Sequence, residues 1–155
     1  LIGGRRIAVC VDEEHPHPTG QPHAFLWVFD VTDLNDIKPL STFHVTDFDA
    51  PWANAHLDSD GSYWHGRPEI YGPGAHQFQE HMKMNDGLIY CTWFSAGLRI
   101  IDVADPLRPR ERGYFIPPPA NGFPAPQSND VDVDENGVIY LIDRINGLDI
   151  LMLED

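Results

Sequence analysis

Hydrophobic and polar positions alternate along this chain in short runs, which Gly, Pro, Asn and Asp separate. The clearest series covers residues 79–84, 88–94, 98–104 and 110–116. Short runs of six or seven residues that turn residues separate are typical of consecutive strands. The separators, Asn-Asp-Gly, Ser-Ala-Gly and Asp-Pro-Leu-Arg-Pro, are typical turn sequences. The series therefore predicts four consecutive antiparallel strands.

The same order of strands recurs on both sides of this series. Residues 147–151, Gly-Leu-Asp-Ile-Leu, repeat residues 97–101, Gly-Leu-Arg-Ile-Ile, fifty positions later. On the N-terminal side, residues 6–10, 26–31 and 39–44 match the second, third and fourth strands, which makes Cys10 equivalent to Cys91 and Asp30 to Asp102. Four strands at a period of about fifty residues are typical of propeller blades. We therefore predict an all-β fold, a β-propeller fragment of about two and a half four-stranded blades.

The predicted boundaries divide the chain into one β-propeller segment with two long connections. Blade one covers 5–45 and lacks its first strand, a long loop covers 46–75, blade two covers 76–116, a second loop covers 117–128, and blade three covers 129–155 without its last strand. A β-sandwich is the alternative, but it does not explain the recurrent order of strands and turns.

Two and a half blades cannot close a ring and leave open sheet edges. We therefore expect the chain to be part of a larger propeller or assembly. It would be the C-terminal portion of a longer polypeptide, a cleavage product held by its other half, or a subunit that completes blades in an oligomer, and the first two are favoured.

Residues 97–106 carry a family resemblance. Their sequence, Gly-Leu-Arg-Ile-Ile-Asp-Val-Ala-Asp-Pro, followed by a second proline and a Gly-Tyr-Phe strand, resembles the LVIVD-repeat family of β-propellers. Residues 138–151 match in part, whereas blade one departs, with Phe25 in place of Gly97 and Asp-Leu-Asn in place of Asp-Pro. More distantly, the chain is similar to the selenium-binding, methanethiol-oxidase-like propellers, which are metal-dependent. The resemblance implies a propeller and says little about function, because propellers host many chemistries.

The long connections are expected to lie on one face. In a four-stranded blade, the connections after the second and fourth strands open on the same side, and here these are the expanded ones, at 13–23, 45–75 and 117–128. Binding residues concentrate on loops that a rigid scaffold holds. The histidines follow this bias: His15, His17, His23, His56, His65 and His76 lie in these loops, and His44 and His81 lie beside them.

One hypothesis places a transition metal at this face. Imidazole is a common metal ligand, and a nearby carboxylate orients it or completes a site. The predicted ligands lie at the start of the innermost strand of blade two and in the long loop: His76, Glu80, His81, His56 and His65. The alternative is that they are hydrogen-bonded loop histidines. His15, His17 and His23 could chelate as well, or belong to an exposed polar loop.

Aromatic side chains offer a second kind of site. Trp52, Tyr63, Trp64 and Tyr71 occur within the longest connection, where they could form a ligand pocket or dock a partner. Alternatively, they fasten the loop to the blade. The acidic stretches 58–62 and 132–137 are interpreted as turns, although the second matches the start of a calcium-binding loop. We expect Trp93 and Phe94 in the core.

Charge and composition exclude some partners. The formal net charge is -14, which argues against nucleic acid and anionic membrane surfaces. No apolar run reaches the length of a membrane span. Because the chain begins with Leu1, we expect the native N-terminus upstream, and no compartment is predicted. Cys10 and Cys91 lie in apolar runs and are expected to be buried thiols.

Three functions remain open. The leading hypothesis is a binding or scaffold module that uses the histidine- and aromatic-rich face for a small molecule or a protein. The alternative is a metal-dependent enzyme, an oxidoreductase, with the metal at the channel mouth. The third is a structural subunit that completes another chain's propeller. The sequence has no nucleotide-binding glycine loop. It also has no Gly-x-Ser-x-Gly elbow, and neither cysteine has a neighbouring histidine in a thiol-enzyme motif, which disfavours hydrolytic serine or cysteine chemistry.

Overall fold

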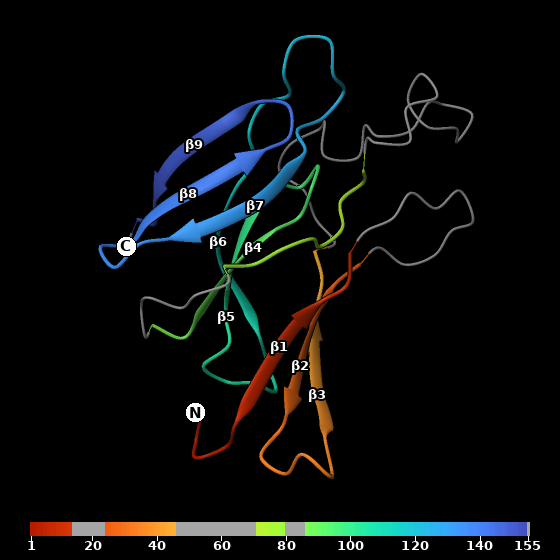
Figure 1. Cartoon of the computed structure of the whole chain (residues 1–155), viewed down its shortest axis with the longest axis vertical. Helices are drawn as coiled ribbons and strands as arrows, with labels where there is room; N and C mark the ends of the chain where they lie inside the picture. The colour runs from red at the N-terminus through yellow and green to blue at the C-terminus, as the bar shows by residue number, and fades with distance from the viewer. Residues whose placement is uncertain (14–23, 46–70, 80–85, 155) are drawn as a thin grey trace, which may run out of the picture.

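Three antiparallel sheets of three strands each make up the part of the chain that the computed structural model describes, residues 1–13, 24–45, 71–79 and 86–154. Sheet one contains β1 (Ile7–Val11), β2 (Leu26–Asp30) and β3 (Lys38–Phe43); sheet two contains β4 (Leu88–Thr92), β5 (Leu98–Asp102) and β6 (Arg110–Phe115); sheet three contains β7 (Ser128–Val133), β8 (Val138–Asp143) and β9 (Gly147–Met152). The predicted all-β, propeller-like arrangement of repeated sheets is confirmed (Figure 1). None of the described residues belongs to a helix of the length and hydropathy that crossing a membrane requires.

Each sheet follows chain order, as the hairpin turns predict. The first strand of blade two is present in part, because residues 76–79 run along β4. The Gln79 N–H donates to the Tyr90 carbonyl at 3.2 Å, and the His76 N–H donates to the Thr92 carbonyl at 2.9 Å. Residues 80–85 lie outside the described ranges.

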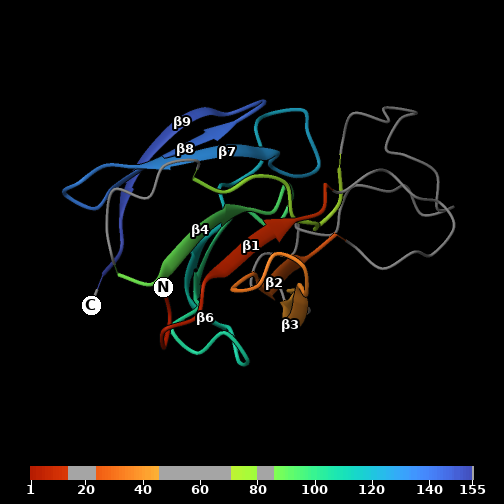
Figure 2. The ribbon, with the colours of Figure 1, turned by 60° about the horizontal axis from the view of Figure 1, so that its bottom comes forward.

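Sheet two lies between the other two sheets, and each of its faces is buried in a separate core (Figure 2). One core joins sheets one and two through Leu26, Val28, Ile89, Cys91, Trp93 and Ile101. The other joins sheets two and three through Tyr90, Leu98, Ile100, Val131, Val133, Ile139 and Leu141. At the outer edge, a Cβ at Gly113 would lie 3.1 Å from the Leu153 Cδ1, so glycine lets β6 approach the chain after β9. The sheets therefore pack in sequence order.

Blades one and two share a turn that aspartates build. The Asp30 carboxylate accepts the Thr32 N–H at 2.9 Å, and the Asp102 carboxylate accepts the Ala104 N–H at 2.8 Å. Three residues further on, Asp33 and Asp105 each accept the N–H of the second residue that follows. Because the carboxylates close the turn, blade one keeps it without the Asp-Pro of blade two.

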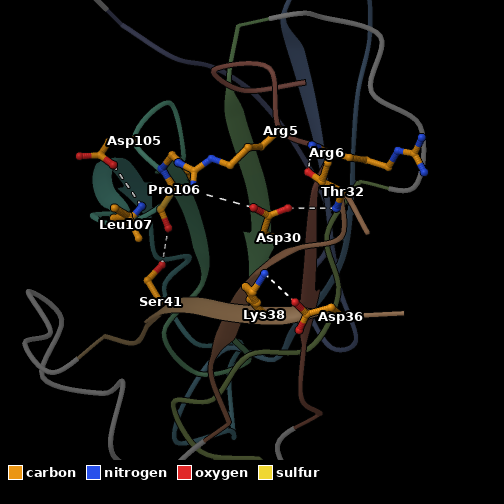
Figure 3. Close-up of polar contacts among 10 residues, drawn as sticks. All are labelled: Arg5, Arg6, Asp30, Thr32, Asp36, Lys38, Ser41, Asp105, Pro106 and Leu107. Carbon is orange, nitrogen blue, oxygen red and sulfur yellow. Dashed lines mark hydrogen bonds and ion pairs between the residues drawn. The ribbon is translucent and has the colours of Figure 1, made fainter. Parts of the chain in front are cut away.

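The same turns hold sheets one and two together. The Ser41 hydroxyl donates to the Pro106 carbonyl at 2.7 Å, which links β3 to the turn of blade two (Figure 3). Hydrogen bonds from Thr32 also lower the pKa of Asp30. This end of the molecule is therefore closed by short, hydrogen-bonded connections.

The prediction that both cysteines are buried is wrong for Cys10, which is exposed, and is confirmed for Cys91. Both cysteines lie on the same side of their sheets, which in sheet two is the side that faces sheet one. Sheet one packs on that face in blade two, and burial raises the pKa of the Cys91 thiol. Trp93 and Phe94 are fully buried, as predicted. Residues 132–137 join β7 to β8 as a hairpin turn, which is also as predicted.

Candidate functional site

Side chains from all three blades meet at the end of the sheets opposite the aspartate turns. We call them the mouth cluster: Glu13, Tyr71, His76, Phe94, Asn129 and Arg144. Glu13 follows β1, Phe94 follows β4, and Arg144 follows β8, so three sheets contribute. The long connections also begin or end beside these residues, which brings the cluster to the predicted loop-bearing face.

His76 has a fixed ring orientation. Its Nδ1 lies 2.6 Å from the Asn129 carbonyl oxygen. A carbonyl only accepts, so Nδ1 carries a hydrogen in this contact. The Nε2 atom lies 3.6 Å from a carboxylate oxygen of Glu13, and the side chain is only 10% exposed. His76 therefore presents Nε2 to an acidic group at the end of β1.

Arg144 lies over an aromatic stack. The rings of Tyr71 and Phe94 are stacked with centroids 4.5 Å apart, and the His76 ring lies 4.5 Å from Phe94 on a tilted plane. The Arg144 guanidinium carbon is 4.9 Å from the Tyr71 centroid and 5.0 Å from the Phe94 centroid. Its Nε donates to the Asn129 side-chain oxygen. Two aromatic faces and one hydrogen bond thus hold an exposed cation in one orientation.

Phe94 has a strained backbone. Its φ is 38°, and it is the one non-glycine residue with positive φ in the described ranges. Such a conformation costs about 1–3 kcal/mol and persists where surrounding contacts enforce it. Here the Phe94 carbonyl accepts from the N–H groups of Ser128 and Gly97, both at 3.1 Å. Strain of this kind concentrates at binding and catalytic sites.

Tyr71 is fixed through its backbone. The Gln127 side chain accepts the Tyr71 N–H at 2.7 Å and donates to the Tyr71 carbonyl at 3.0 Å. Gln127 is itself fully buried, and its N–H donates to the Asp143 carboxylate at 2.6 Å. Sheet three therefore anchors the end of the longest connection, and the aromatic stack with it.

Two of the predicted site residues come together, Tyr71 and His76. The other predicted residues lie outside the described ranges: His56, His65, Glu80 and His81 of the metal hypothesis, Trp52, Tyr63 and Trp64 of the aromatic one, and His15, His17, His23 and the stretch 58–62. Across residues 1–13, 24–45, 71–79 and 86–154, no group of three or more His, Cys, Asp and Glu side chains could hold a metal ion.

Four members of the mouth cluster were not predicted as site residues: Glu13, Phe94, Asn129 and Arg144. A signal existed for Arg144, because it follows the second strand of blade three, and that connection opens on the loop-bearing face. Glu13 directly precedes the histidine-rich loop. Nothing in the sequence pointed to the strained backbone of Phe94.

No protein-family model matches the chain, and a comparison with curated proteins finds no match to its sequence. The resemblance to the LVIVD-repeat family therefore stays a prediction, and the function is argued from the site.

Proposed function

We propose that this chain is a propeller-like binding module that takes a carboxylate-bearing ligand at the mouth cluster. The observation that supports this most is the exposed guanidinium of Arg144, which lies over Tyr71 and Phe94 and donates through Nε to Asn129. Arginine matches a carboxylate with two parallel hydrogen bonds, and its planar group retains them when it is stacked on a ring.

The contacts that hold the Arg144 guanidinium favour binding because they exist before a ligand arrives. Ordering a flexible side chain on binding costs about 0.5–1.5 kcal/mol. Asn129 and the aromatic stack remove much of that cost, since they hold the guanidinium before a ligand arrives. The half-buried ring of Tyr71 adds apolar surface next to the cation. An aromatic or apolar group that carries a carboxylate would use both features.

Benzoate is the simplest probe of this proposal. Titration into isotope-labelled protein, followed by nuclear magnetic resonance, should give saturable shifts of the backbone signals of His76, Phe94 and Arg144. Benzamide, which lacks the charge, should give much smaller shifts.

The substitution Arg144→Gln should abolish the benzoate response. The matched control is Arg110→Gln, because Arg110 is an exposed arginine at the start of β6, at the opposite end of the sheets. Equal benzoate responses in the wild-type protein and in Arg144→Gln would contradict the proposal, as would a response lost in both variants.

A metal-dependent enzyme, of the oxidoreductase class, stays a second candidate because of His76. A metal-binding histidine commonly donates its other ring N–H to a carbonyl, and His76 donates to Asn129 while Nε2 lies near Glu13. These residues supply two donors, so a site needs further ligands, and the predicted His56, His65, Glu80 and His81 are the candidates.

Elemental analysis by plasma mass spectrometry tests this candidate on natively purified protein. A stoichiometric transition metal is expected in the wild-type protein and should be lost in His76→Ala. It should persist in His44→Ala, which removes an exposed histidine beyond the end of β3. A metal-free wild-type protein, or equal metal in both variants, would eliminate the candidate.

A further inference from the structure

Two hydrogen-bond acceptors face each other in the mouth cluster. The Nδ1 atom of His76 carries a hydrogen toward the Asn129 carbonyl, so in the neutral ring Nε2 has a lone pair. Nε2 faces a carboxylate oxygen of Glu13, and an ionised carboxylate also only accepts. Their separation of 3.6 Å is longer than the ~2.7–2.9 Å of a charge-assisted N–H···O hydrogen bond. We call His76 Nε2 and the Glu13 carboxylate the acceptor pair.

The acceptor pair suits an ammonium group. A primary ammonium has three N–H donors on one positive nitrogen, so it can donate to His76 Nε2 and to Glu13 at the same time. The charge of the carboxylate strengthens the second of these bonds. A carboxylate accepts from several donors at once, so Glu13 keeps this capacity whatever other contacts it makes. The Glu13 side chain is 46% exposed, and a dissolved molecule can therefore reach the acceptor pair.

One residue and one ring fix the spacing between the acceptor pair and Arg144. Asn129 accepts from His76 through its main-chain carbonyl and from the Arg144 Nε through its side-chain oxygen. The Phe94 centroid lies 4.5 Å from the His76 centroid and 5.0 Å from the Arg144 guanidinium carbon. The imidazole and the guanidinium are thus no further apart than these two contacts in series. A small molecule with an ammonium and a carboxylate a few bonds apart can contact both.

Resting on the proposed function, in which Arg144 binds a carboxylate, we propose that the ligand of the mouth cluster is a free amino acid with an apolar or aromatic side chain. Its ammonium group donates to His76 Nε2 and Glu13, and its carboxylate accepts from Arg144. The half-buried ring of Tyr71, stacked on Phe94, offers apolar surface to the side chain. A peptide end carries only one of the two charges and would use half of these contacts.

Phenylalanine and 3-phenylpropionate test this assignment, because they share the ring and the carboxylate and differ in the ammonium group. Nuclear magnetic resonance titrations of the isotope-labelled protein at neutral pH give the dissociation constants. The wild-type protein should bind phenylalanine about tenfold more tightly, which corresponds to one hydrogen bond between charged groups. N-acetylphenylalanine, which imitates the C-terminus of a peptide, should bind no more tightly than 3-phenylpropionate.

The substitution Glu13→Gln separates the ammonium contact from the carboxylate contact. It removes the charge of the acceptor pair, so the two dissociation constants should become nearly equal. Binding of 3-phenylpropionate should stay at the wild-type level, which also verifies that the variant is folded. The matched control is Glu135→Gln, an exposed glutamate between β7 and β8, at the other end of sheet three from Arg144. This control should keep the tenfold preference for phenylalanine.

A chelator distinguishes an ammonium group from a metal ion at the acceptor pair. Imidazole and carboxylate are metal ligands as well, and a metal held there would also prefer phenylalanine, whose amine can coordinate it. The titrations are therefore made in excess EDTA, where the preference for phenylalanine should persist. A preference that EDTA abolishes would show that a metal occupies the acceptor pair, and the ammonium assignment would be wrong.

The remaining outcomes tell the two proposals apart. Equal affinity of the wild-type protein for phenylalanine and 3-phenylpropionate would overturn the amino-acid ligand and leave the carboxylate site standing. If neither compound binds, both proposals fail. The ammonium assignment would also be refuted by a Glu13→Gln variant that retains the tenfold preference, or by one that loses both compounds to the same extent.

Discussion

Gly97 lies in the turn between β4 and β5 with a φ of 74°, a conformation that residues with a side chain rarely adopt. A Cβ at this position would also collide with the carbonyl oxygen of Phe115. Gly147 is the equivalent residue of blade three, at the start of β9, with a φ of 95° and open space around it. The two glycines therefore differ in the steric cost of a methyl group.

We expect Gly97→Ala to lower the free energy of unfolding by about 3 kcal/mol, since a backbone collision adds to the conformational cost. Gly147→Ala should lower it by about 1 kcal/mol, which is the conformational cost alone. Chemical denaturation followed by tryptophan fluorescence measures both. A loss of stability that is the same for the two variants would show that the Phe115 carbonyl moves aside.

At the residue scale, the sequence predicts which positions of the repeated strands correspond to each other better than it predicts how exposed their side chains are. Cys10 and Cys91 do occupy matching strand positions, yet one is exposed and the other is buried. The reason is that burial depends on whether another sheet packs on that side, and alternation within a strand carries no information about neighbouring sheets.

Among the elements, the hairpin between β7 and β8 depends on one carboxylate. Asp134 accepts the N–H of Asn136 at 2.8 Å and of Val138 at 2.9 Å, and its second oxygen lies near the Tyr140 hydroxyl. The bond from the Val138 N–H is the main cause that lowers the pKa of Asp134. The turn is therefore stabilised by the ionised form of Asp134.

The stability that Asp134 contributes should be present above the pKa of the unfolded chain and lost as the pH falls through the lower folded pKa. Free energies of unfolding from neutral to acidic pH should therefore decline less steeply in Asp134→Asn than in the wild-type protein. Glu135→Gln removes the same charge from the neighbouring position and should keep the wild-type slope. An unchanged slope in Asp134→Asn would mean that the turn does not depend on the charge.

Strands could be predicted because the internal repeat and the turn residues agree on where they begin and end. The repeat at 147–151, for example, differs from β9 by one residue. The sequence did not predict the irregularities in strand pairing. Pairing shifts between Val28 and Phe29 and, at the equivalent place in blade two, between Ile100 and Ile101. The partner strand β6 has mostly polar or exposed positions, and these set no register that the sequence could reveal.

For the whole molecule, the sequence predicted which end of the sheets carries the long connections, but it did not predict which side chains meet there. The order of strands predicted which connections share an end, and Tyr71 and His76 do meet there. Glu13 and Arg144 join them from the first and third blades, across more than half of the chain. Such neighbours are set by the packing of one sheet on the next, which the pattern within a strand does not encode.

The close approach at Gly113 has a consequence for the angle between blades two and three. Leu153 fits against β6 because Gly113 has no side chain, so this contact influences the tilt of sheet three relative to sheet two. A larger residue at this position would push the chain after β9 away from β6, and sheet three would tilt with it. The angle between two consecutive blades therefore depends on the missing side chain of a residue that lies outside the mouth cluster.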